Sequence, residues 1–190
     1  AELDETLDFL ATEVSVSAGT TFTTARMNSL VTNFDESLKL LVAMLQNPAF
    51  NPQRLEVSKA RLVEALKQRN DNASSILGRE WKALLYGRTH FEASQATGAS
   101  VAAINREQLQ QVHDRIIHPG NMIVAVSGDF DTATMLRKLS DAFAGWERGP
   151  QGADPAAPTA ELAPGLYHVS KDIPQGKVVL GKRAISRDDP

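Results

Sequence analysis

Histidine is the residue type in this sequence that could supply nitrogen ligands to a metal, and its four copies are poorly spaced for that task. His113 and His118 lie five positions apart. Zinc ligands on one helix are usually four apart, because a turn of about 100° per residue brings positions i and i+4 onto one face. A spacing of five leaves two side chains about 140° apart. We therefore predict no metal site at this pair, and structural or exposed roles for His90 and His168.

Other motifs that carry chemistry are missing from the sequence. The chain has no cysteine, which excludes a thiolate nucleophile, a disulfide framework and Cys-ligated zinc or iron–sulfur sites. Ser127-Gly128-Asp129 follows an apolar run, where α/β proteins often bind ligands, but no G-x-G-x-x-G or Walker loop accompanies it. There is also no G-x-S-x-G nucleophile elbow. Nucleotide binding is therefore not expected.

The composition indicates an ordinary globular protein. The chain has 190 residues, of which 42% are hydrophobic and 23% charged. Its net charge of −3 gives no support for a nucleic-acid or anionic-membrane partner. No segment approaches the roughly 20 apolar residues that cross a bilayer, and we expect no signal peptide. Because the sequence begins at Ala1 without a methionine, we expect that a segment has been removed before it. A periplasmic and a cytoplasmic location both fit these features.

The hydrophobic pattern predicts helices mixed with short strands. Apolar residues at helical spacing predict helices over residues 2–12, 35–46, 52–70, 74–86, 106–117 and 131–143. Asn51 and Asn105 are expected as N-caps, and Pro52 suits the first position of its helix. Alternating or continuous apolar runs predict strands over Val14–Ala18, Thr20–Leu30, Met122–Ser127, Leu166–Val169 and Val178–Leu180.

Composition also divides the chain. Residues 149–165 are mostly proline, glycine and alanine, which is typical of a linker. We predict an α+β domain over residues 1–148 that lacks its N-terminal part, a linker over 149–165, and the truncated start of a second repeat over 166–190.

The order of several short segments resembles one protein family. These segments include Asn47-Pro-Ala-Phe50, Leu84-Leu-Tyr-Gly87, Pro119-Gly-Asn121 and Gly128-Asp-Phe130. Together they resemble the insulinase/pitrilysin/mitochondrial-processing-peptidase family, the inverted-motif zinc peptidases, and the resemblance covers nearly the whole chain. It implies a layered α+β fold with helices packed on one face of a mainly antiparallel sheet.

The resemblance also implies what the zinc chemistry would need. Active members hold zinc with two histidines of H-x-x-E-H, whose glutamate is the general base, and with a glutamate from a later helix. No H-x-x-E-H occurs here, and by family order it would lie upstream of Ala1. In the later helix Lys59 and Leu66 match the family pattern, but Ser58 replaces its first glutamate and Ala65 replaces the zinc ligand. We therefore predict no catalytic residue, no metal ligand and no cofactor in this chain.

Glu64 is the alternative ligand if that alignment is wrong by one residue. On a helical wheel it points about 150° away from the apolar stripe of its helix, towards solvent. We expect a solvated glutamate paired with Lys67 or Gln68. If Glu64 did bind zinc, the chain would be a fragment of an active metalloendopeptidase.

Members of the family also bind extended peptides by adding a strand to a sheet edge. Ser15-Val16 falls where active members have an Asn-Ala segment, so we predict peptide binding at Ser15, Val16 and Ser17, with an ordinary sheet strand as the alternative. We predict a non-catalytic subunit or half that encloses peptide or unfolded protein together with a catalytic peptidase partner. An active zinc peptidase fragment and a structural assembly subunit without a peptide role remain alternatives.

Overall fold

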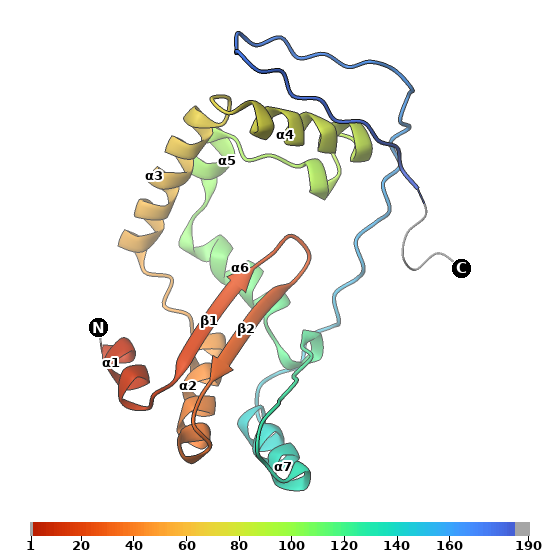
Figure 1. Ribbon diagram of the computed structural model, residues 1–190. Helices are drawn as coiled ribbons and strands as arrows, with labels where there is room; N and C mark the ends of the chain where they lie inside the picture. Colours follow the sequence, from red (N-terminus) through yellow and green to blue (C-terminus); the bar gives the residue numbers. More distant parts are fainter. Residues whose placement is uncertain (1, 185–190) are drawn as a thin grey trace. The chain divides into compact units, whose positions relative to one another are not determined.

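The computed structural model describes residues 2–184, with only the backbone of Glu2. The chain forms two compact units, and each unit is built from two stretches of the sequence. The first unit comprises the residues up to Pro52 and residues 105–154, and the second comprises residues 53–104 and those from Pro155 onwards. The colours of Figure 1 follow the sequence, so that both stretches of each unit can be traced.

The first unit combines a β-hairpin with helices. In chain order its elements are α1 (Glu2–Phe9), β1 (Glu13–Ala18), β2 (Thr23–Asn28), a 3-10 turn (Val31–Asn33), α2 (Phe34–Gln46), α6 (Arg106–Ile116), a second 3-10 turn (Pro119–Asn121) and α7 (Thr132–Ala142). Helix α1 ends earlier than the predicted residue 12, because Ala11 adopts a positive φ of 47° and the Thr12 amide donates back to the carbonyl of Leu7.

A small core joins the hairpin entrance to α2 and α7. Leu38 and Val42, one turn apart on α2, are buried, as are Leu10 and Met135. Beside them the hydroxyl oxygens of Thr12 and Ser37 lie 2.6 Å apart, and the Ser37 hydroxyl also donates to the carbonyl of Asn33. These buried polar groups are therefore paired with one another, which avoids the cost of an unpartnered hydroxyl.

The second unit is helical in its described residues. Its helices are α3 (Pro52–Gln68), α4 (Ala73–Tyr86), a 3-10 turn (Phe91–Ala93) and α5 (Gly98–Ala103). The buried side chains are small, namely those of Ala83, Ala93 and Val101.

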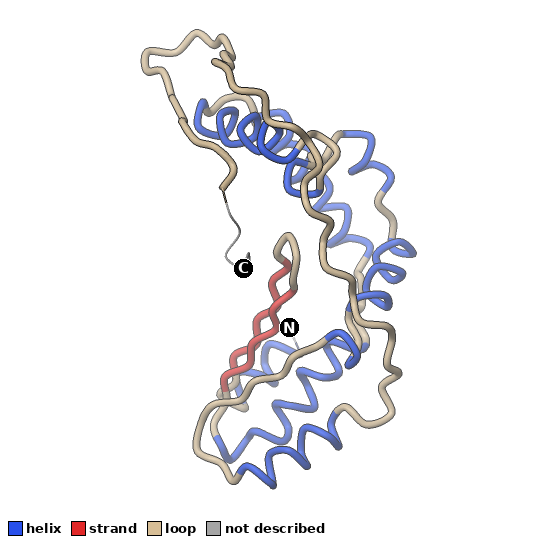
Figure 2. Tube along the Cα trace, turned by 90° about the vertical axis from the view of Figure 1, so that its right-hand side faces the viewer, coloured by secondary structure: helices blue, strands red, loops and turns tan. Residues whose placement is uncertain are grey.

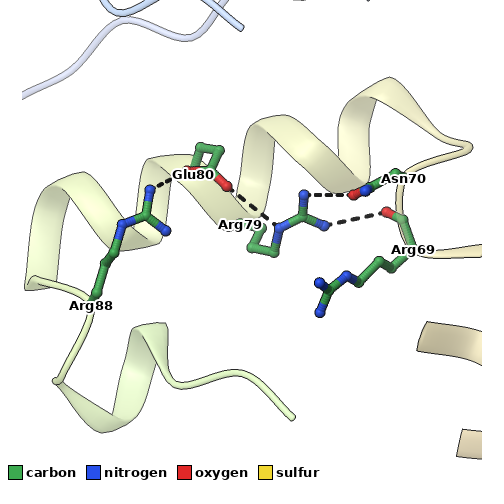
Figure 3. Close-up of polar contacts among 5 residues, drawn as sticks. All are labelled: Arg69, Asn70, Arg79, Glu80 and Arg88. Carbon is green, nitrogen blue, oxygen red and sulfur yellow. Dashed lines mark hydrogen bonds and ion pairs between the residues drawn. The ribbon is translucent and has the colours of Figure 1, made fainter. Parts of the chain in front are cut away.

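Arg79 connects the end of α3 to α4, as Figure 3 shows. Its guanidinium donates to the carbonyl of Arg69 at 3.3 Å and to Oδ1 of Asn70 at 2.8 Å. It also lies 3.5 Å from Glu80, which in turn pairs with Arg88 at 2.7 Å. The turn after α3 is thus held by one side chain of α4, which bonds to two residues of the turn.

The α+β class is confirmed, but the sheet is smaller than predicted. Among residues 2–184 the sheet contains only β1 and β2, paired antiparallel. The predicted strands Met122–Ser127, Leu166–Val169 and Val178–Leu180 were wrong, since these segments are irregular, as the loops of Figure 2 show. Ile123, for example, is 99% exposed. A strand is defined by pairing with a neighbour, and no described segment pairs with these three.

Two further features bear on the organisation of the chain. The segment 149–165 contains no helix or strand, and the predicted division into a domain, a linker and a second repeat stays a prediction. No helix within residues 2–184 combines the length and the apolar character needed to cross a membrane.

The capping of α6 gives the first prediction. The Asn105 side chain accepts from the Gln108 amide at 2.8 Å, and the Gln108 side chain accepts from the Asn105 amide at 3.2 Å. Asn105→Ala removes the first of these bonds and should lower the free energy of unfolding by about 1 kcal/mol. Denaturant titration followed by circular dichroism measures the change. Asn105→Asp keeps an acceptor and should cost much less, so equal losses in the two variants would contradict this role.

Candidate functional site

Helix α3 carries the position where the family resemblance placed a zinc ligand. Ala65 and Ser58 are both exposed to solvent, and neither side chain has a carboxylate to offer. Zinc in catalytic sites is held by nitrogen, sulfur or carboxylate oxygen ligands at about 2 Å, which a methyl group cannot replace. This helix therefore presents no ligand at position 65.

Glu64 is engaged by its own helix. Its carboxylate accepts hydrogen bonds from Lys67 Nζ at 3.1 Å and from Gln68 Nε2 at 3.2 Å, and its side chain is 56% exposed. The hydrogen bond from Lys67, followed by the charge of Lys67 and the hydrogen bond from Gln68, lowers the pKa of Glu64 from its ordinary value. The predicted pairing of Glu64 with Lys67 or Gln68 is confirmed, and both partners are present.

Lys59 has a structural role that the sequence did not reveal. Its ammonium group donates to the carbonyls of Ala102 at 3.3 Å and Ile104 at 3.0 Å, at the end of α5, and pairs with Glu56 at 3.3 Å. A cation is favourable there, because the last carbonyls of a helix lack partners within the helix and carry partial negative charge. Lys59 therefore fastens α5 to α3.

Three of the four histidines use both ring nitrogens in hydrogen bonds. His113 contacts the carbonyl of Leu45 at 2.7 Å and Oδ1 of Asp114 at 3.1 Å, and the contact with His113 is the main cause of a lowered pKa of Asp114. His90 accepts from the Glu92 amide and donates to the carbonyl of Ala156. His118 contacts Arg115 and Gly149.

These rings have no nitrogen left for a metal. Within residues 2–184, no three side chains of His, Cys, Asp or Glu are close enough to hold a metal ion.

The β-hairpin offers a different kind of site, at its outer edge. Gly19 donates its amide to the carbonyl of Phe22, which makes this pair a hydrogen-bonded one. Hydrogen-bonded and non-hydrogen-bonded pairs alternate along an antiparallel ladder. From the register, Ser17 and Ser15 therefore bond to β2, opposite Thr24 and Arg26.

The intervening residues of β1 direct their backbone groups outwards. These residues are Val14, Val16 and Ala18, which face Met27, Ala25 and Thr23 in non-hydrogen-bonded pairs. The outer edge of β1 pairs with no strand in the described part of the chain, and Val16 is 51% exposed. Of the three predicted peptide-binding residues, Val16 alone presents free main-chain groups at this edge. Val14 and Ala18, which the prediction did not include, direct their main-chain groups to the same edge, as the period of two along a strand requires.

Known proteins similar to this chain include zinc proteases and a non-peptidase homolog. The sequence model described as "Peptidase M16 inactive domain" matches residues 103–190. An uncharacterized zinc protease of Mycobacterium leprae is 30% identical over 162 residues, which are 80% of this chain and 36% of that protein. A non-peptidase homolog of Helicobacter pylori is 24% identical over 110 residues, which are 57% of this chain and 26% of that protein.

A solved structure shows the same fold. The crystal structure of a peptidase M16 inactive domain from Pseudomonas fluorescens superposes with a TM-score of 0.73 at 23% identity, over 83% of this chain and 39% of that one. The chain spans about a third of the length of the curated relatives, with 36%, 31% and 33% of three of them covered. The chain therefore belongs to the insulinase/pitrilysin/mitochondrial-processing-peptidase family, the M16 peptidases, with residues 103–190 in the part described as its inactive domain.

Proposed function

We propose that this chain acts in a non-catalytic subunit or half of an M16 peptidase, which helps a catalytic partner to enclose and bind peptides. The observation that carries the proposal is the surface of α3. It presents the methyl group of Ala65 where a metal ligand would be required, and the neighbouring carboxylate of Glu64 is already bonded to Lys67 and Gln68.

The angular spacing of a helix supports this proposal. Consecutive residues are separated by about 100°, so a carboxylate at position 64 points in a different direction from one at position 65. To bind a metal aligned with position 65, Glu64 would have to break its hydrogen bonds with Lys67 and Gln68. Nothing else on this face of α3 replaces it, since Ser58 also lacks a carboxylate.

Peptide binding would use the outer edge of β1. An extended peptide can pair with the outward amide and carbonyl of Val16, and further along with those of Val14 and Ala18. Such pairing needs main-chain groups only, so it does not depend on the side chains of Ser15 and Ser17. Those two hydroxyls project from the face of the hairpin that also carries the side chains of Arg26 and Thr24, not from the edge where a peptide would pair.

A second candidate is supported by the names of relatives. Several, including those of Mycobacterium leprae and Bacillus subtilis, are called uncharacterized zinc proteases. If the name zinc protease also describes this chain, the chain is part of an active zinc metalloendopeptidase. Its H-x-x-E-H motif then lies upstream, and Glu64 is the third ligand. The non-peptidase homolog of Helicobacter pylori supports the first candidate instead.

The zinc content of the protein separates the two candidates. We expect the protein, purified with all the residues that its gene encodes, to contain well below one equivalent of zinc by elemental analysis. Glu64→Gln should leave that content unchanged, as should the matched control Glu56→Gln on the same helix. One equivalent of zinc that is lost in Glu64→Gln and kept in Glu56→Gln would establish the metallopeptidase and overturn the proposal.

Proline substitutions at the two edges of the hairpin test peptide binding. Val16→Pro removes an outward amide from β1, whereas Ala25→Pro removes the directly opposite outward amide from β2. With a fluorescein-labelled, unstructured peptide, Val16→Pro should weaken binding about tenfold, as expected for one lost hydrogen bond of about 1.4 kcal/mol. Fluorescence anisotropy measures the dissociation constants.

The control variants define the alternative outcomes. Ala25→Pro, Ser15→Ala and Ser17→Ala should bind the peptide almost as the unaltered protein does. Equal weakening by Val16→Pro and Ala25→Pro would mean that the edge of β1 is not the site. No binding by the unaltered protein would favour the structural assembly subunit without a peptide role.

A further inference from the structure

His118 is a buried histidine that the proposed function does not use. It lies two residues after the end of α6, and only 3% of its surface is exposed. Its Nε2 lies 3.2 Å from the carbonyl of Arg115, and its Nδ1 accepts a hydrogen bond from the amide of Gly149 at 3.2 Å. Because a carbonyl can only accept, Nε2 must carry the proton, and Nδ1 must be free of one. Both hydrogen bonds can form together only in the tautomer that carries its proton on Nε2.

A second contact of the same kind lies beside it. Asn121 accepts a hydrogen bond from the amide of Gly152 at 3.0 Å and donates to the carbonyl of Ile116 at 3.0 Å. Two side chains at the end of α6 therefore hold two backbone amides that follow 31 residues later. We call His118, Asn121, Gly149 and Gly152 the clasp.

The clasp is closely packed around its glycines. A Cβ atom at Gly149 would lie only 2.7 Å from His118 Nε2, and one at Gly120 would collide with the carbonyl of Gly149. The segment reaches the imidazole because it has no side chain at this point. Any change in the hydrogen bonding of the ring therefore acts directly on the backbone at Gly149.

The clasp lies where the chain leaves the first unit. Residues up to Asp154 belong to that unit, and the second unit resumes at Pro155. Residues 149–154 form no helix or strand, so their attachment depends on a few contacts such as those of the clasp. When the clasp opens, these residues lose that attachment to the first unit.

We propose that His118 is a pH-operated latch, which releases residues 149–152 when its ring is protonated. A proton on Nδ1 turns the acceptor of the Gly149 amide into a donor, so that two N–H groups face each other. The charged ring would also be buried without a counter-charge, which is unfavourable. Acidification therefore opens the clasp, and the neutral ring closes it.

The charged groups near the ring do not offset this effect. The segments packed against His118 carry Asp114 and Arg115 in α6, and Glu147 and Arg148 just before Gly149. The carboxylate of Asp114 is occupied by His113 and Gln110. None of the ion pairs formed by residues 2–184 joins a carboxylate to His118.

Amide hydrogen exchange tests the latch in the complete chain. Protection factors of Gly149 and Gly152, corrected for the intrinsic pH dependence of exchange, are compared at about pH 7.5 and about pH 5 while NMR follows the protonation of the His118 ring. We expect the protection of Gly149 to fall about tenfold at the lower pH, as for one lost hydrogen bond. The amides of α2 should keep their protection, which separates local opening from unfolding.

Two substitutions sharpen this test. His118→Gln keeps one acceptor and one donor but does not titrate, so Gly149 should stay equally protected at both pH values. His168→Gln, at an exposed histidine, should leave the response of the unaltered protein intact. The latch is disproved if Gly149 stays protected although the ring is charged, if the ring stays neutral at about pH 5, or if His118→Gln shows the same pH response. Should His118→Gln not fold, the measurements on the unaltered protein decide the question alone.

Discussion

The fixed angle between successive residues of a helix is the constraint on which the interpretation of α3 depends. A loop could move a carboxylate by one position and still reach the same point in space, but a helix cannot, because each step turns the side chain by about 100°. Glu64 is therefore not a substitute for a carboxylate at position 65. Its bonds to Lys67 and Gln68, at positions three and four along the same helix, are those that its direction favours. The direction of Glu64, as well as the identity of residue 65, thus leaves α3 without a carboxylate that points from position 65.

Helices and strands differed in how far the sequence predicted them. Except for the short α5, which was not predicted, the helices were predicted well because their signals are local. Asn105 caps α6 through bonds within one turn, and Leu38 and Val42 mark the buried face of α2. Strands require a partner that can lie anywhere in the chain. The hairpin of β1 and β2 was found because its partners are adjacent in the sequence. Met122–Ser127 has an apolar pattern typical of a buried strand, yet no described segment pairs with it, and it stays irregular.

The contacts between remote segments of the chain were the least predictable. Lys59 binds the carbonyls of Ala102 and Ile104, and His118 binds the amide of Gly149. In each case a side chain contacts the backbone of a remote segment. Because nearly all residues carry the same backbone groups, the sequence does not indicate which of them a side chain will contact. The pattern could show that Glu64 faces solvent and that Val16 lies on a strand. It could not show that an imidazole touches a glycine, because that glycine contributes only an amide and the space left by its missing side chain.

In helix α3, the residue that stabilises the fold differs from the residue at the position of the zinc ligand. Lys59 supports the fold, since it fastens the end of α5, whereas Ala65 is exposed and contributes little to packing. A carboxylate at an exposed position can be exchanged for a methyl group without leaving a cavity or an unpaired buried group, so the cost to stability is small. The same exchange removes a metal ligand completely. The edge of β1 is equally independent of that ligand, because the hydrogen bonds of its backbone do not involve α3. A chain of this kind can therefore keep the fold of its family and an unpaired strand edge without a carboxylate at position 65.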